Sequence, residues 1–179
     1  MTFIIFGSGL SGKSLANYFS KKKEKSFLYD DSILSKEKKD FFQSRKISIL
    51  SKLLLEKLIE KEKLEIILSP GVPLNHPLLI KARKYKQKIF SETQFSLSRI
   101  ETPVIAITGT NGKSTVASMC YHILKESGYK TSLVGNIGTP ISTLLLKKQN
   151  WDFLVLEMSS YQLEQMSQNN FFRSVFINF

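Results

Sequence analysis

The chain has 179 residues, 42% of them hydrophobic, with a formal net charge of +11 and a single cysteine. One thiol excludes a disulfide framework and a thiolate metal cluster, and no run approaches the roughly 18 apolar residues that span a membrane. The basic excess is nearly all lysine interleaved with acidic residues, without the grouped arginines and aromatic platforms of base-recognising proteins. We therefore expect no nucleic-acid partner and no membrane partner. The N-terminus has no export signal, which indicates a cytoplasmic protein.

The first half of the chain alternates between strand and helix patterns. Apolar runs predict strands at 3–6, 27–29, 47–50 and 65–68, and amphipathic spacing predicts helices at 12–22, 35–45, 52–61 and 77–86. Ser69-Pro70-Gly71 marks a turn, and His76 before Pro77 is expected to begin a helix. Such a series predicts an α/β fold with a parallel sheet and helices on both faces.

The pattern then restarts after a helical stretch at 92–99. Strands are predicted at 104–107, 131–134, 153–157 and 174–178, with helices at 113–126 and up to Leu146. We place a domain boundary near residues 99 to 103. The expected domains are a Rossmann-like parallel-sheet domain at 1–99 and part of a P-loop-type domain at 100–179.

A first glycine loop, Gly7 to Gly12, follows the first strand. It matches G-x-G-x-x-G, and with Lys13 and Ser14 it also matches G-x-x-x-x-G-K-[ST]. A loop of either pattern directs backbone N–H groups and a helix N-terminus at one spot, which suits the binding of a phosphate. Asp30 ends the next strand, where an acid can bond a ribose hydroxyl or a base edge. This favours a Rossmann-like nucleotide site in which Lys13 is a bystander, with a purely structural turn as the alternative.

A second glycine loop, Gly109 to Thr115, follows the strand at 104–107. A full P-loop pattern would need glycine where Ile107 stands. Even so, Gly112-Lys113-Ser114 keeps the lysine that reaches terminal phosphates and a hydroxyl that can bind Mg²⁺. Glu157 ends a hydrophobic strand, where a buried acid needs a cation or hydrogen-bond donors, so it is placed like a second magnesium ligand. A solvated lysine is the alternative for Lys113.

These motifs resemble a known family. Residues 106–115 resemble the ATP loop of the Mur ligases and of the related folylpolyglutamate synthetases. Residues 135–138 and 156–164 are similar to the D-glutamate-adding branch of that superfamily, in which Gln162 is the discriminating residue. The first glycine loop, Asp30 and residues 69–77 agree, so the resemblance extends over the whole chain.

The resemblance implies a ligase that uses ATP and Mg²⁺ to add D-glutamate to UDP-N-acetylmuramoyl-L-alanine, through an acyl phosphate, in peptidoglycan synthesis. It implies catalytic roles for Lys113, Asn136 and Glu157, and metal binding by Ser114 and Glu157. The implied ATP-binding residues are Gly109, Thr110, Asn111, Gly112, Lys113, Ser114 and Thr115. The implied contacts to the UDP substrate are Leu10, Ser11 and Asn136 at the diphosphate, Asp30 and Asp31 at uracil, Gly71 at ribose, and Ser159 and Gln162 near the muramoyl-alanine group. Asp31-Ser32 departs from the family pattern, which has a small hydroxyl residue followed by a basic one.

Members of this family continue beyond the position of Phe179 with a magnesium-ligating histidine, a carbamylated lysine and a D-glutamate-binding domain. We therefore expect the 179 residues alone to be inactive and poorly soluble unless a complementing C-terminal chain supplies these parts. A stand-alone nucleotide-binding module without ligase activity is the alternative. A third hypothesis, an NAD-dependent oxidoreductase built on the first loop, leaves Lys113 and Glu157 unexplained.

Overall fold

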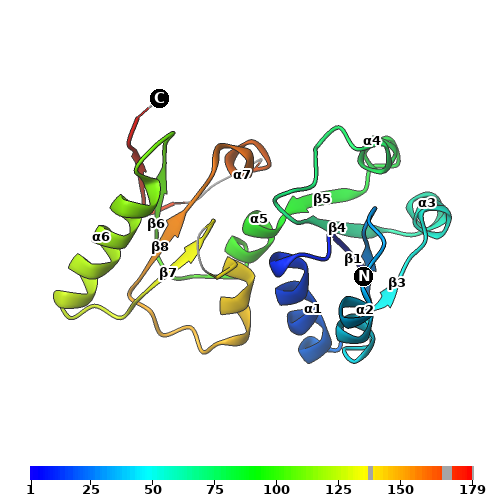
Figure 1. The fold of residues 1–179 in the computed structure, drawn as a ribbon, viewed down its shortest axis with the longest axis horizontal. Helices are drawn as coiled ribbons and strands as arrows, with labels where there is room; N and C mark the ends of the chain where they lie inside the picture. Colours follow the sequence, from blue (N-terminus) through cyan, green and yellow to red (C-terminus); the bar gives the residue numbers. More distant parts are fainter. Residues whose placement is uncertain (137–138, 167–170, 179) are drawn as a thin grey trace. The chain divides into compact units, whose positions relative to one another are not determined.

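The chain folds into two compact units, Met1–Glu92 and Thr93–Phe179 (Figure 1). The computed structural model describes residues 1–136, 139–166 and 171–178. The boundary predicted near residues 99 to 103 lies after helix α5 (Glu92–Leu97). Leu97, at the end of that helix, packs against the core of the second unit.

The first unit is built on one parallel sheet with the strand order β3-β2-β1-β4-β5. Its strands are β1 (Thr2–Phe6), β2 (Ser26–Tyr29), β3 (Ser48–Ile49), β4 (Leu64–Leu68) and β5 (Lys88–Ser91). Its helices are α1 (Leu10–Lys22), α2 (Lys36–Gln43), α3 (Lys52–Lys61) and α4 (Pro77–Lys84). These elements confirm the predicted α/β alternation. The N-cap of α4 is His76, as predicted, because its Nδ1 accepts the N–H of Leu78 at 3.1 Å.

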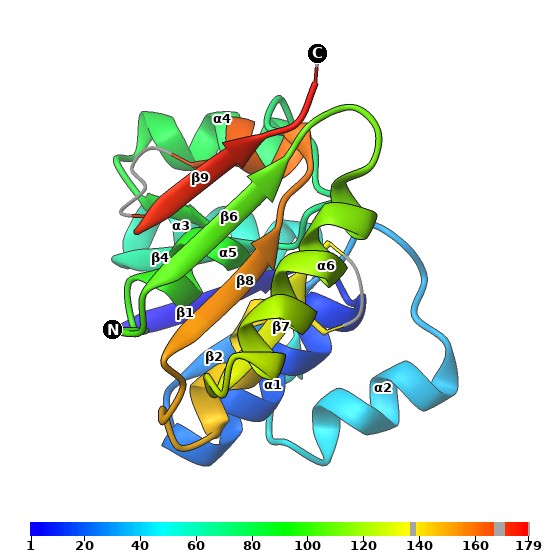
Figure 2. The ribbon, with the colours of Figure 1, turned by 90° about the vertical axis from the view of Figure 1, so that its left-hand side faces the viewer.

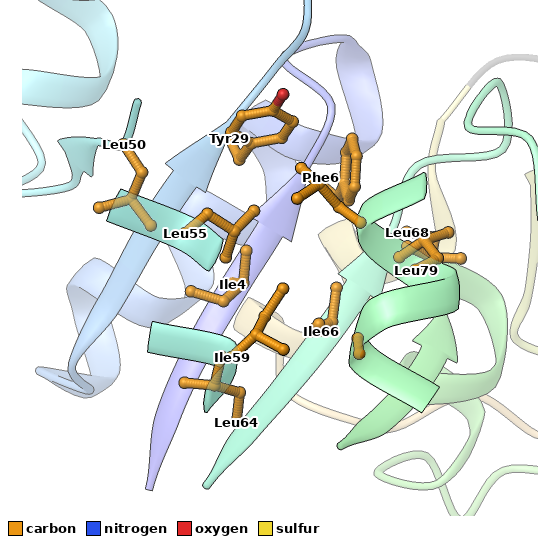
Figure 3. Close-up of a cluster of buried hydrophobic side chains, with 12 residues drawn as sticks. Ile4, Phe6, Tyr29, Leu50, Leu55, Ile59, Leu64, Ile66, Leu68 and Leu79 are labelled. Atoms are coloured by element: carbon orange, nitrogen blue, oxygen red, sulfur yellow. The ribbon is translucent and has the colours of Figure 1, made fainter. Parts of the chain in front are cut away.

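Helices cover both faces of this sheet. Successive side chains of a strand point to opposite sides, and residues 3–6 of β1 are all apolar, so both faces carry side chains that need to be buried. On one face, Ile4 and Phe6 of β1 join side chains of β4, α3 and α4 in a buried cluster, whose members Ile66, Leu55 and Leu79 are drawn in Figure 3. On the other face, Phe3 stacks on Phe19 of α1 with ring centroids 4.6 Å apart. All five residues of β1 are buried, as expected for the central strand of a doubly covered parallel sheet.

The second unit has a parallel sheet with the order β7-β8-β6-β9 among the described residues. The strands are β6 (Val104–Thr108), β7 (Thr131–Gly135), β8 (Phe153–Glu157) and β9 (Arg173–Phe176). Figure 2 shows α6 (Lys113–Glu126) lying over one face, where Ala117 packs against Ile107 and Val155. The opposite face holds the 3₁₀ helix η1 (Ile141–Leu146), whose Ile141 and Leu144 are buried against the sheet. The short helix α7 (Ser160–Glu164) follows β8.

Two sequence predictions need correction in this unit. The helix expected up to Leu146 is a 3₁₀ helix, and its β-branched Ile141 and Thr143 are weak α-helix formers. The strand expected at 174–178 ends at Phe176, because Asn178 leaves the sheet to bond the second glycine loop. Part of the predicted loop at 135–138, residues 137 and 138, lies outside the described residues. No helix in the described part of the chain is long and apolar enough to cross a membrane.

Candidate functional site

A pocket of about 520 Å³ opens at the carboxyl edge of the first sheet. Three loops line it, one after each of β1, β2 and β4. Because β1 pairs with β2 on one side and β4 on the other, the pocket lies where the strand order reverses. Ligands of doubly wound α/β sheets bind at such switch points, and the volume falls within the range of ligand pockets.

The first glycine loop packs α1 tightly against the end of β1. A Cβ added at Gly12 would lie 2.0 Å from the carbonyl oxygen of Gly7, so only glycine fits there. Lys13 does not point into the pocket, because its Nζ lies 5.3 Å from the centre of the Phe41 ring. Both observations support the Rossmann-like interpretation of this loop over the ATP-type P-loop.

Asp30 holds the first glycine loop in place through a hydrogen bond. Its Oδ2 accepts the N–H of Ser8 at 2.7 Å, and its Oδ1 accepts the N–H of Ser32 at 2.9 Å. Burial alone would raise the pKa of Asp30, but the hydrogen bonds from Ser32 and Ser8 outweigh it and hold the pKa below its usual value. The carboxylate is therefore a fixed anion that shapes the rim of the pocket.

Asp31 also forms contacts within the first unit. The Tyr29 hydroxyl donates to its Oδ1 at 2.7 Å, and Nε2 of His76 lies 3.0 Å from its Oδ2. Burial, together with the bond to Asp31 and the charge on that residue, raises the pKa of Tyr29 above its ordinary value. A contact of Asp31 with uracil stays a prediction.

The five residues of this unit that sequence analysis assigned to the UDP substrate all line the same pocket, namely Leu10, Ser11, Asp30, Asp31 and Gly71. The sequence analysis missed Lys38, which comes from α2 and also lines it. The Nζ of Lys38 donates to Oγ of Ser8 at 3.1 Å. The mixed stretch of three lysines and Glu37 at residues 36–39 gave no signal, because it matches an ordinary solvated helix face.

The second glycine loop joins β6 to α6, and Gly112 is the N-cap of that helix. The ammonium group of Lys113 folds back over the loop and donates to the carbonyl oxygens of Gly109 at 2.8 Å and Thr110 at 3.0 Å. Sequence analysis also missed Asn178. Its Oδ1 accepts the N–H of Thr110 at 2.9 Å and that of Asn111 at 3.0 Å. Two N–H groups of the loop thus converge on one oxygen atom, as they would on an oxygen of a phosphate.

Glu157 ends β8 beside this loop, since it pairs in register with Ile107 of β6. Its side chain is 2% exposed, and its Oε1 accepts from Nδ2 of Asn136 at 3.3 Å. Gly135 makes this approach possible. It has φ +118°, and an added Cβ would lie only 2.1 Å from the carbonyl oxygen of Glu157. The structure thus brings together two predicted catalytic residues, Asn136 and Glu157.

The Glu157 carboxylate and the Ser114 hydroxyl are hard oxygen donors of the kind that Mg²⁺ prefers. The described residues contain no group of three or more His, Cys, Asp or Glu side chains that could hold a metal. Mg²⁺ needs few protein ligands, because it usually keeps several waters and binds substrate phosphates. The residues present are therefore compatible with a magnesium ion shared with a nucleotide.

Ser159 and Gln162 form hydrogen bonds with each other. The Ser159 hydroxyl accepts the N–H of Gln162 at 3.3 Å, and Oε1 of Gln162 accepts the N–H of Ser159 at 2.8 Å. This is a capping box at the start of α7. The S-x-x-Q spacing could have predicted it from the sequence. Their role near the substrate stays a prediction.

The fold and the two glycine loops place the chain in the class of α/β proteins that bind ligands at the carboxyl edges of parallel sheets. Residues 1–91 match the family described as "Mur ligase MurD-like, N-terminal domain", and residues 107–179 match "Mur ligase middle domain". The chain belongs to the Mur ligase family, with an N-terminal domain of the MurD-like kind. The resemblance and the fold class predicted from the sequence are thereby confirmed.

Curated relatives named UDP-N-acetylmuramoylalanine–D-glutamate ligase agree with this assignment. The protein from Buchnera aphidicola subsp. Acyrthosiphon pisum (strain Tuc7) is 41% identical over 164 residues, which are 90% of this chain and 36% of that protein. The protein from Protochlamydia amoebophila (strain UWE25) is 32% identical over 176 residues, which are 98% of this chain and 40% of that protein. The chain thus spans well under half the length of these relatives.

Two solved structures share the fold. The UDP-N-acetylmuramate:L-alanyl-gamma-D-glutamyl-meso-diaminopimelate ligase from Neisseria meningitides has a TM-score of 0.51 and 18% identity, covering 87% of this chain and 52% of that one. The murein peptide ligase from Psychrobacter arcticus 273-4 has the same TM-score of 0.51 and 18% identity, covering 90% of this chain and 39% of that one. At this identity the likeness concerns the fold alone.

Proposed function

We propose that this chain supplies the nucleotide-sugar site and the ATP site of a ligase that joins D-glutamate to UDP-N-acetylmuramoyl-L-alanine. The observation that carries the proposal is the second glycine loop. There the N–H groups of Thr110 and Asn111 converge on one oxygen atom, with Lys113 on the same loop and the buried Glu157 on the neighbouring strand. These groups are of the kinds that a site for a magnesium nucleotide would use, which supports the proposal.

The first pocket would take the UDP part of the substrate. Leu10 and Ser11 lie at the N-terminus of α1, where backbone N–H groups and the helix dipole favour a diphosphate. Asp30 and Gly71 lie on the other two loops that line the pocket. The names of the curated relatives contain this substrate, which supports extending it to the present chain.

The second loop would hold the phosphates of ATP. When ATP binds, Lys113 would donate to phosphate oxygens in place of the carbonyl oxygens of Gly109 and Thr110. The N–H groups of Thr110 and Asn111 would likewise donate to the phosphates in place of Asn178. Ser114 and Glu157 would hold Mg²⁺, which when bound supplies positive charge to the terminal phosphates. Asn136 would keep the Glu157 carboxylate in place.

The chemistry is carboxylate activation. An oxygen of the alanine carboxylate attacks the γ-phosphorus of ATP, and ADP leaves. The D-glutamate amine then attacks the acyl carbon, inorganic phosphate leaves, and the amine proton passes to solvent. Transfer between two anions needs charge neutralisation above all, which Lys113 and the loop N–H groups provide.

Amide formation in the presence of all three substrates tests this function. The 179-residue chain is assayed alone and together with a C-terminal chain that supplies the remaining length of the relatives. We expect the complemented protein to form the ligated product, and Lys113→Ala to abolish it while Lys125→Ala, at the far end of α6, leaves it intact. If nucleotides bind but no amide forms in either case, the chain is a binding module and the ligase proposal is wrong.

A further inference from the structure

We propose that Lys38 is the cation that binds the diphosphate in the first pocket. This inference rests on the proposed function, since it takes the ligand of that pocket to be a nucleoside diphosphate group. It assigns the phosphate-binding charge to α2 and not to the glycine loop itself. Lys13, the lysine of that loop, lies over the Phe41 ring instead.

The charge of the pocket requires such a cation. The lining contains the carboxylates of Asp30 and Asp31, and Lys38 is the one cationic side chain among the described residues that line it. A diphosphate brings at least two further negative charges. Without Lys38, the N-terminus of α1 would be the only positive group in the described lining to offset the diphosphate and the two carboxylates.

The geometry places the charge at the glycine loop. The Nζ of Lys38 lies 3.1 Å from Oγ of Ser8, and the N–H of Ser8 is tied to Asp30 at 2.7 Å. Ser8 lies between Gly7 and Gly9, directly before the N-terminus of α1. The ammonium group of Lys38 and the positive end of α1 therefore lie at the same part of the pocket.

The fold holds α2 in the orientation that this contact needs. Oγ of Ser35 accepts the N–H of Lys38 at 3.4 Å and caps the helix, and Phe42 is fully buried beneath it. The Phe41 ring contacts both Lys13 of α1, whose Nζ is 5.3 Å from the ring centre, and the Arg45 guanidinium, whose carbon is 3.5 Å from it. Lys38 is half-buried, whereas Lys39 next to it is exposed.

Calorimetric titration of the 179-residue chain with UDP, and separately with uridine, tests the proposal. We expect Lys38→Ala and Lys38→Gln to weaken UDP binding about tenfold while uridine binding stays within twofold of the unchanged chain. Glutamine is the sharper variant, because it keeps a donor for Ser8 but lacks the charge. Lys39→Ala is the matched control and should bind UDP as the unchanged chain does. Thermal melting verifies that each variant is folded.

The outcomes separate this inference from the proposed function. Equal UDP affinity in Lys38→Gln, Lys39→Ala and the unchanged chain would overturn the role of Lys38 and leave the pocket a UDP site. An equal loss of UDP and uridine binding in Lys38→Gln would also overturn it, because the residue would then be structural. If the unchanged chain binds neither UDP nor UDP-N-acetylmuramoyl-L-alanine, both the nucleotide-sugar site and this inference are wrong.

Discussion

Asn178 and Asn111 exchange two hydrogen bonds: the N–H of Asn111 donates to Oδ1 of Asn178 at 3.0 Å, and Nδ2 of Asn178 donates to the carbonyl oxygen of Asn111 at 3.2 Å. The same Oδ1 accepts the N–H of Thr110 at 2.9 Å. Asn178, two residues after the end of β9, thus holds the second glycine loop through the groups that a phosphate would use.

Replacing this amide by a carboxylate should weaken ATP binding. In Asn178→Asp, a charged acceptor bonds the loop N–H groups more strongly and also repels the phosphates. We expect magnesium-ATP to bind at least about tenfold more weakly, a change of about 1.4 kcal/mol. Calorimetric titration measures it. Asn150→Asp adds the same charge at an exposed position of the same unit and should change the affinity little; a similar loss in both variants would mean that charge alone is responsible.

Substitution of Gly135 should destabilise the fold, because the backbone passes close to Glu157 at this residue and brings Asn136 to it. Alanine there combines φ +118° with a Cβ 2.1 Å from a carbonyl oxygen. We expect Gly135→Ala to lower the free energy of unfolding by about 2 kcal/mol or more. Gly128 also has a positive φ, +86°, but an added Cβ would meet nothing within 4 Å. Urea unfolding should therefore show a smaller loss in Gly128→Ala, and equal losses would argue against the close contact.

The capping box makes a separate prediction for Ser159. Ser159→Ala should cost about 1 kcal/mol of stability, and Ser159→Asp should restore most of it, because aspartate is also a good N-cap. The neighbouring Ser160→Ala, at an exposed position, should have little effect on melting temperature. If Ser159→Ala leaves the melting temperature unchanged, the cap contributes nothing to the fold.

The contribution of Asp30 to stability should depend on pH. The folded-state pKa of Asp30 lies below its ordinary value, so the ionised form is the one that folding favours. The stabilisation is fully present above the unfolded pKa and disappears as the pH falls through the lower folded pKa. Asp30→Asn should therefore cost on the order of 1–2 kcal/mol at pH 7, and the difference from the unchanged chain should shrink below about pH 4. Urea unfolding at several pH values measures this, and a difference that grows toward low pH would contradict it.

Much of the first site could be predicted from the sequence, because a parallel sheet brings the carboxyl ends of its strands to one edge. Leu10, Asp30 and Gly71 are distant in sequence, yet each follows a predicted strand and each lines the pocket. Lys38 could not be predicted in the same way. Its place depends on how α2 packs through Phe41 and Phe42, which no local pattern encodes.

The second unit shows other reasons for missed features. Asn178 continued an apolar strand pattern, and only the tertiary structure shows that it turns to Thr110 and Asn111. The bonds between Ser159 and Gln162 had a local signal, the S-x-x-Q spacing, but the same letters also fitted a family motif. A motif that supports a function can thus conceal a simpler structural role.

The transfer of oxygen from substrate to phosphate tests the central claim most directly. UDP-N-acetylmuramoyl-L-alanine is labelled with heavy oxygen in its alanine carboxylate and incubated with ATP, Mg²⁺, D-glutamate and the complemented protein. An acyl-phosphate ligase predicts one labelled oxygen in each inorganic phosphate released, and no release with Lys113→Ala. Release of unlabelled phosphate by the unchanged protein would contradict the account, because ATP would then be hydrolysed without activating the carboxylate.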